Sequence, residues 1–145
     1  MHSILRIRRL FGAGLGAAAI ALAGCAGMSM NKNVSVSLSG GEQVPPVSTA
    51  ARGNGSFTVN EDRSVSGSVT ISGLSPIAAH IHVGARGKNG PVAIGLTKSS
   101  DTVWALPAGA KFNDEQYRAF LAGETYVNFH TAANKGGEIR AQLTP

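Results

Sequence analysis

The sequence predicts an all-β protein in which antiparallel strands form a β-sandwich or barrel with one short helix. Three observations lead to this fold class: segments in which apolar and polar residues alternate, glycine-rich turns that separate them at short intervals, and a single segment with helix signals. An N-terminal leader accounts for part of the 145 residues. The roughly 120 residues after it suffice for one domain with its own core.

Alternation is clearest in the first predicted strand, where Val34, Val36 and Leu38 alternate with serines. Side chains two residues apart lie on the same face of a strand, so one face of this strand is apolar and the other is polar. Similar patterns, or short apolar runs bounded by Gly and Pro, mark the other strands. The predicted strands cover residues 34–39, 55–60, 65–71, 77–83, 91–96, 102–106, 125–130 and 137–143.

The single helix is predicted near residues 113–122. Asn113 has a side chain suited to an N-cap, and Gln116 follows three residues later, as in a capping box. An apolar stripe follows within the segment, and Gly123 has the residue type that commonly ends a helix.

The first 24 residues are predicted to be a lipoprotein signal peptide. A basic start that contains Arg6, Arg8 and Arg9 precedes an uncharged stretch from residue 10 to residue 23. This stretch is too short to span a membrane and has the length of a signal-peptide core. It ends in Leu22-Ala23-Gly24-Cys25, which matches the lipobox that precedes a lipidated cysteine. An ordinary secretory signal with an incidental cysteine is the alternative.

Cleavage before Cys25 would leave the lipidated cysteine and a tether at residues 25–33, followed by one domain at residues 34–145. We therefore expect a protein of the bacterial cell envelope that is attached to the membrane by acyl chains on Cys25. Ala26, rather than Asp, follows the cysteine, which favours the outer membrane, with the domain facing the periplasm or the cell surface.

Charge and cysteine content exclude several function classes. All 8 acidic residues follow Cys25, whereas three of the 13 basic ones precede it, so the mature chain carries a net charge of only +2. No run of Lys or Arg remains in it, and we expect no nucleic-acid partner. Cys25 is the only cysteine, which excludes an intrachain disulfide and metal sites built on thiolates.

Histidines are the residues that most clearly indicate a site. His80 and His82 are two residues apart in one predicted strand, and His130 shares a face with Asn128 in another. If the two strands are neighbours, the three imidazoles can converge, and imidazole is a ligand for copper and zinc. We therefore predict a metal site of His80, His82 and His130 that would hold one copper or zinc ion.

A histidine that binds a metal usually donates its other ring N–H to an acceptor. The residues considered for this second-sphere role are Asn128, Glu138 and Asp101. The alternative is that the histidines hydrogen-bond loop backbone and only brace the loops, with no metal.

Two further residue patterns have structural interpretations. Glu138 and Arg140 share a strand face, and an ion pair, on that face or across strands, is favoured over an acid–base role. Trp104, the only tryptophan, is expected in the core rather than in a ligand site. No nucleophile motif is present, so the sequence leaves catalysis undecided and favours its absence.

An ordered set of motifs runs through almost all of the predicted mature chain. These motifs are LSG at 38–40, EQVPPV at 42–47, GLSP at 73–76, AHIH at 79–82, GKNGPV at 87–92, YVNFHT at 126–131 and GGEIRAQL at 136–143. The ordered set resembles the CHRD domain, the module named after chordin and also found in bacterial secreted proteins. The resemblance implies an immunoglobulin-like Greek-key β-sandwich or barrel, and it says far less about biochemical function.

A fainter resemblance concerns His80-Ile81-His82, which is similar to the copper-binding strand of Cu/Zn superoxide dismutases. Those enzymes have more histidines and a disulfide, so a dinuclear centre is excluded here and a mononuclear site remains. The leading hypothesis is a lipid-anchored, non-catalytic binding module with one copper or zinc ion. The alternatives are a structural module that binds a protein or matrix partner and, less favoured, a metal-dependent redox enzyme.

Overall fold

A computed structural model of the chain describes residues 30–145. The predicted signal peptide at 1–24, the lipidation site Cys25 and most of the predicted tether therefore lie outside the described residues. Strand β1 (Lys32–Leu38) begins two residues before the predicted domain boundary at residue 34. Regular structure thus includes the end of the segment that was predicted to be a tether.

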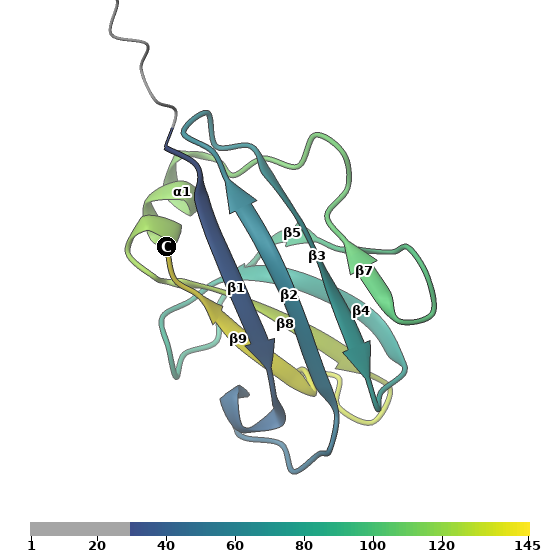
Figure 1. The fold of residues 1–145 in the computed structure, drawn as a ribbon. Coiled ribbons are helices and arrows are strands. Elements are labelled where there is room, and N and C mark those ends of the chain that lie inside the picture. Colours follow the sequence, from purple (N-terminus) through teal and green to yellow (C-terminus); the bar gives the residue numbers. More distant parts are fainter. Residues whose placement is uncertain (1–29) are drawn as a thin grey trace, which may run out of the picture.

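Two antiparallel sheets stack face to face (Figure 1). The first has the strand order β1-β2-β3-β7-β6, and the second has the order β5-β4-β8-β9. The remaining strands of the first sheet are β2 (Arg52–Val59), β3 (Val65–Ser72), β6 (Thr97–Lys98) and β7 (Val103–Ala105). The second sheet consists of β4 (Pro76–Val83), β5 (Val92–Gly95), β8 (Thr125–Thr131) and β9 (Ile139–Leu143).

The all-β prediction is confirmed, and of its two forms the structure is the sandwich, because neither sheet closes into a barrel. The chain crosses from the first sheet to the second after β3, returns after β5, and crosses again after β7. As a result, β8 lies beside β4 although more than 40 residues separate them in the sequence. This crossover brings the two histidine-bearing strands together.

The core fills the space between the sheets. Ile81, Val127 and Phe129 of the second sheet are fully buried there against Phe57 and Val69 of the first. Burial of apolar side chains of this size stabilises the fold by about 1.5–3 kcal/mol each. Trp104 belongs to this core, with its ring 5.9 Å from that of Phe129, which confirms its structural interpretation.

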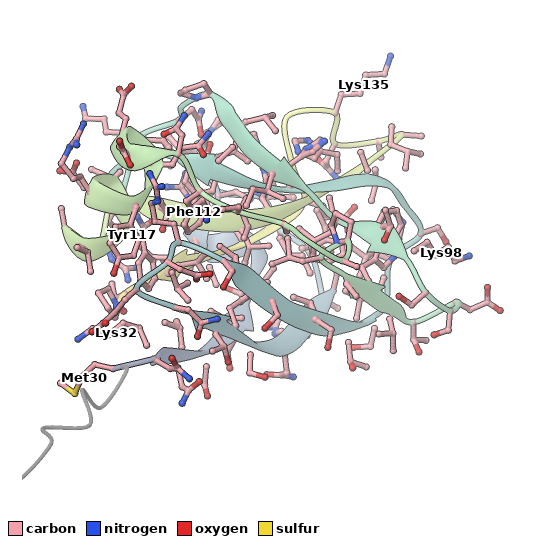
Figure 2. The ribbon with its side chains drawn as sticks, turned by 90° about the horizontal axis from the view of Figure 1, so that it is seen from above. Met30, Lys32, Lys98, Phe112, Tyr117 and Lys135 are labelled. Atoms are coloured by element: carbon pink, nitrogen blue, oxygen red, sulfur yellow. The ribbon has the colours of Figure 1, made fainter. Side chains whose placement is uncertain are left out.

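Helix α1 (Asp114–Leu121) follows β7 and lies near the C-terminal end of the chain (Figure 1). The predicted capping box is present: Asn113 Oδ1 accepts from the Gln116 N–H at 2.8 Å, and the Asn113 N–H donates to Gln116 Oε1 at 2.9 Å. Gly123 follows the C-cap with φ +73°, a conformation that glycine adopts without steric cost. Figure 2 shows Phe112 and Tyr117 at this end of the sandwich. No helix among residues 30–145 is long and apolar enough to cross a membrane.

The outer face of the second sheet is also largely buried. Tyr126, Asn128 and Arg140 point away from the core, yet each is at most 2% exposed. Their cover comes in part from the β4–β5 loop, residues 84–91, whose backbone and side chains bond to this face. The sandwich therefore has a second, polar buried layer outside its apolar core.

The predicted ion pair between Glu138 and Arg140 is wrong. The Glu138 carboxylate accepts hydrogen bonds from Thr49 and Thr131, whereas the Arg140 guanidinium donates into the polar layer. Glu138 lies just before β9 and Arg140 within it, and the two side chains are satisfied by different parts of the molecule.

Candidate metal site

Strands β4 and β8 bring the three histidines together on the outer face of the second sheet. In the antiparallel register, His80 lies opposite Asn128 and His82 opposite Tyr126, while His130 is paired with Ala78. One ring nitrogen from each of His80, His82 and His130 lies within 4.8 Å of the other two. The prediction that these three imidazoles converge is confirmed.

Two of the rings have a fixed tautomer. His82 Nδ1 lies 2.9 Å from the Gly90 carbonyl oxygen, and His130 Nδ1 lies 2.8 Å from that of Lys135. Because a carbonyl oxygen only accepts, Nδ1 carries the proton in both rings and Nε2 carries the lone pair. This arrangement is typical of metal-binding histidines, whose second nitrogen is held by an acceptor.

The third ring, that of His80, is hydrogen-bonded to the ring of His130. His80 Nδ1 lies 3.1 Å from His130 Nε2, so that His80 donates and His130 accepts in the metal-free form. Two nitrogens that bind one tetrahedral zinc ion at about 2.0–2.1 Å are separated by about 3.3 Å. The separation of His80 and His130 is already close to that of two ligands of one ion, provided that His80 binds through a deprotonated nitrogen.

Burial keeps two of the imidazoles neutral. Desolvation is the main cause that lowers the pKa of His82, and its hydrogen bond to Gly90 opposes this in part. The pKa of His80 is lowered by desolvation and then by the neighbouring rings of His130 and His82. Both rings are therefore uncharged near pH 7, the form in which imidazole binds a metal.

Tyr126 connects the histidines to the rest of the polar layer. Its ring stacks on that of His82, with centroids 4.8 Å apart and planes within 2° of parallel. The Arg140 guanidinium carbon lies 3.4 Å from the centroid of the same phenol ring. Strand β8 lies between β4 and β9, so Tyr126 stands between a histidine ligand candidate and a buried cation.

Three buried polar atoms at this face have no hydrogen-bond partner among residues 30–145: His82 Nε2, Asn128 Oδ1 and Gln43 Nε2. The first two are acceptors, and a buried acceptor without a donor costs about 1–3 kcal/mol. A cation bound among the three imidazoles would satisfy the lone pair of His82, so the chemistry of the donor set fits a metal ion.

The predicted second-sphere residues have different surroundings. Asn128 is 2% exposed and stands directly opposite His80 on the neighbouring strand, but its Oδ1 accepts no hydrogen bond among residues 30–145. Glu138 instead bonds to Thr49, Thr131 and Asn134, and Asp101 pairs with Lys98 at the surface between β6 and β7. The Nδ1–H groups of His82 and His130 donate to main-chain carbonyls instead of to these predicted residues.

Sequence reasoning missed Arg140 and Gln43 as parts of this face, and it placed Tyr126 there beside His130 without giving it a role. Tyr126 and Arg140 are recoverable from period-2 spacing, because they share their strand faces with Asn128 and Gln142 respectively. Gln43 comes from the segment after β1, and no local pattern in the sequence indicates that it reaches the second sheet.

Comparison with known proteins agrees with this architecture. A model of the CHRD domain family matches residues 34–143, which include every strand from β2 to β9 and most of β1. The searches of curated proteins and of solved structures each find no match. The family match covers most of the chain, and the chain therefore belongs to the CHRD domain family.

Proposed function

We propose that this CHRD domain is a non-catalytic module that binds one copper or zinc ion through His80, His82 and His130. The observation that carries the proposal is the convergence of three ring nitrogens within 4.8 Å, two of which belong to rings whose other nitrogen is held by a carbonyl. Three imidazoles with a water molecule form a common open site for such ions.

Ion binding requires only a small change of geometry. His82 Nε2 already has a free lone pair, and the His80–His130 separation of 3.1 Å is close to a ligand–ligand distance. The main adjustment is a change of tautomer at His80, whose Nδ1 proton moves to Nε2 so that Nδ1 can bind the ion. Because only the neutral imidazole binds a metal, binding at this site weakens at low pH, where the histidines are protonated.

A competition titration tests the proposal. The chain from residue 26 onward, which contains the complete sandwich, is titrated with Zn(II) and Cu(II) against a coloured chelator. We expect one ion per chain, and a His80→Ala/His82→Ala double variant that binds at least a hundredfold more weakly. Lys88→Ala, at an exposed residue in the adjacent loop, is the matched control and should bind as the wild type does. Equal affinity of the double variant and the wild type would refute the site.

A structural role is the second candidate, favoured by one specific observation. His82 bonds to residue 90 in the β4–β5 loop and His130 to residue 135 in the β8–β9 turn, so the imidazoles brace both segments. In this case the domain presents those loops to a protein or matrix partner. The double variant would then lose stability, and the wild type would bind no ion in the titration.

The proposal places the module in the bacterial cell envelope, held at the membrane by a lipid on Cys25. Its support is the lipobox at residues 22–25 and the short uncharged stretch before it. Ala26 supports the outer membrane, with the domain facing the periplasm or the cell surface. Incorporation of a labelled fatty acid by the wild type and not by a Cys25→Ser variant tests the anchor. Equal labelling of the two would refute it.

A further inference from the structure

The proposed metal site contains no negative charge. The group of ligand atoms that lie within 4.8 Å of one another consists of three imidazoles and includes no Asp or Glu. Asn128 Oδ1, an additional acceptor on this face, belongs to a neutral amide. Any charge that an ion brings to this site is therefore left uncompensated by its protein ligands.

The charged group built into this face is a cation. Arg140 is 1% exposed, and its guanidinium stacks on Tyr126, which in turn stacks on His82. It donates to the Ala85 carbonyl, the Asn89 amide oxygen and the Gln142 amide oxygen, all of which are neutral. Among residues 30–145, Arg140 takes part in no salt bridge, and the Glu42 carboxylate, whose charge acts on it, is paired with Arg86.

Burial increases the importance of this charge imbalance. His82 is 7% and Asn128 is 2% exposed, so one side of the site is removed from water. Where solvent screens poorly, each additional unit of positive charge on a bound ion is costly unless an anion lies nearby. An ion with one positive charge avoids most of this cost, and copper is the ion among the two candidates that has such a state.

We propose that the three-histidine site selects Cu(I) over Cu(II) and Zn(II). This inference rests on the proposed metal-binding function and specifies its ion. It follows from the neutral donor set of His80, His82 and His130, their partial burial, and the proximity of the uncompensated Arg140. Imidazole binds copper in general, so the selection arises from charge and not from the type of ligand atom.

The test compares affinities for Cu(I), Cu(II) and Zn(II), with Cu(I) handled under anaerobic conditions and competed with a Cu(I)-specific chelator. We expect Cu(I) to bind most tightly to the wild type. Asn128→Asp places a carboxylate of the same shape beside the ion. A unit charge about 4 Å away in a partly buried site should change the Cu(II)-to-Cu(I) affinity ratio by about a thousandfold in favour of Cu(II). For a one-electron couple, this corresponds to a reduction potential lower by about 180 mV.

A surface variant provides the same test if Asn128→Asp does not fold. Lys135 is exposed, and its main-chain carbonyl holds His130. Lys135→Glu should shift the ratio in the same direction by about threefold, reduced by solvent screening. Lys32→Glu makes the same charge change where Figure 2 shows Lys32 on the opposite side of the molecule from Lys135, and it should leave the ratio unchanged.

The outcomes separate this inference from the function on which it rests. The selection of Cu(I) would be overturned, with the metal site left intact, if Zn(II) or Cu(II) bound tightly and Cu(I) were not preferred. The same conclusion would follow if neither Asn128→Asp nor Lys135→Glu changed the Cu(II)-to-Cu(I) affinity ratio. Binding of none of the three ions by the folded wild type would overturn both. A preference for Cu(I) that both acidic variants reduce, and that Lys32→Glu does not, would support both.

Discussion

Gly137 lies where the β8–β9 turn meets the polar layer, and replacing it with alanine should destabilise the domain. Its φ of +122° is unfavourable for residues with a side chain. A Cβ at this position would lie 2.7 Å from Asn128 Nδ2 and would also press on the amide of Gln43. Both amides are at least 97% buried, because their exposed fractions are 2% and 3%, and cannot move into solvent.

The expected cost follows from these terms. Backbone strain contributes about 1–3 kcal/mol, and displacement of packed side chains adds about 1–2 kcal/mol. Reduced freedom of the unfolded chain offsets about 0.4–1 kcal/mol. Gly137→Ala should therefore lower the free energy of unfolding by about 3 kcal/mol, the midpoint of a range of about 1–4.5 kcal/mol.

Urea denaturation monitored by Trp104 fluorescence measures this change, with the neighbouring Gly136→Ala as the control. No atom lies within 4 Å of a Cβ at Gly136, and its φ is outside the unfavourable positive range. We expect the control to change stability by less than about 0.5 kcal/mol. If the two variants were equally stable, the reasoning that the turn is packed against the Asn128 amide would be wrong.

Three other predictions follow from the site and the helix. Because burial lowers the folded-state pKa of His80 and His82, the unfolded chain binds protons more readily, and the free energy of unfolding should fall as pH decreases below about 6.5. This loss of stability between pH 7.5 and pH 5, measured from urea denaturation curves, should be smaller in a His80→Gln/His82→Gln variant than in the wild type. An equal loss in the two proteins would contradict the reasoning. A bound ion at a hundred times its dissociation constant should stabilise the wild type by about 2.7 kcal/mol, measured as a shift of the urea midpoint that a chelator reverses; no shift would contradict the site. Asn113→Ala removes the helix cap and should cost about 1 kcal/mol, whereas Asn31→Ala, outside any strand or helix, should cost almost nothing.

Local patterns predicted the elements of this fold well. Alternation in β1 and the capping residues Asn113 and Gln116 depend on neighbours a few residues away, and the structure confirms both. The shared face of His80 and His82 follows from the same two-residue period. Their approach to His130 required only that β4 and β8 be neighbours, which was a condition of the prediction and is met.

Long-range contacts account for what the sequence did not predict. The acceptors for His82 and His130 are main-chain carbonyls, which every residue has and which no residue type marks. Glu138 was assigned to Arg140 because both are charged and share a face, but hydroxyl groups near Glu138 satisfy it first. The burial of the outer face depends on the β4–β5 loop, which bonds to Tyr126 and Arg140 across more than 30 residues of sequence, and alternation within a strand carries no information about such contacts.

The hydrogen bonds of Gly90 have a consequence for how the domain resists proteolysis. Its carbonyl accepts from His82, and its N–H donates to the Tyr126 hydroxyl 3.2 Å away, so the end of the β4–β5 loop is held by the same side chains that form the site. The loop also carries Arg86 and Lys88, the residue types after which trypsin cleaves, both exposed. Cleavage there needs the loop to detach from the sheet. The rate at which trypsin cleaves between residues 86 and 89 therefore reports how often the β4–β5 loop detaches from the face that carries the histidines.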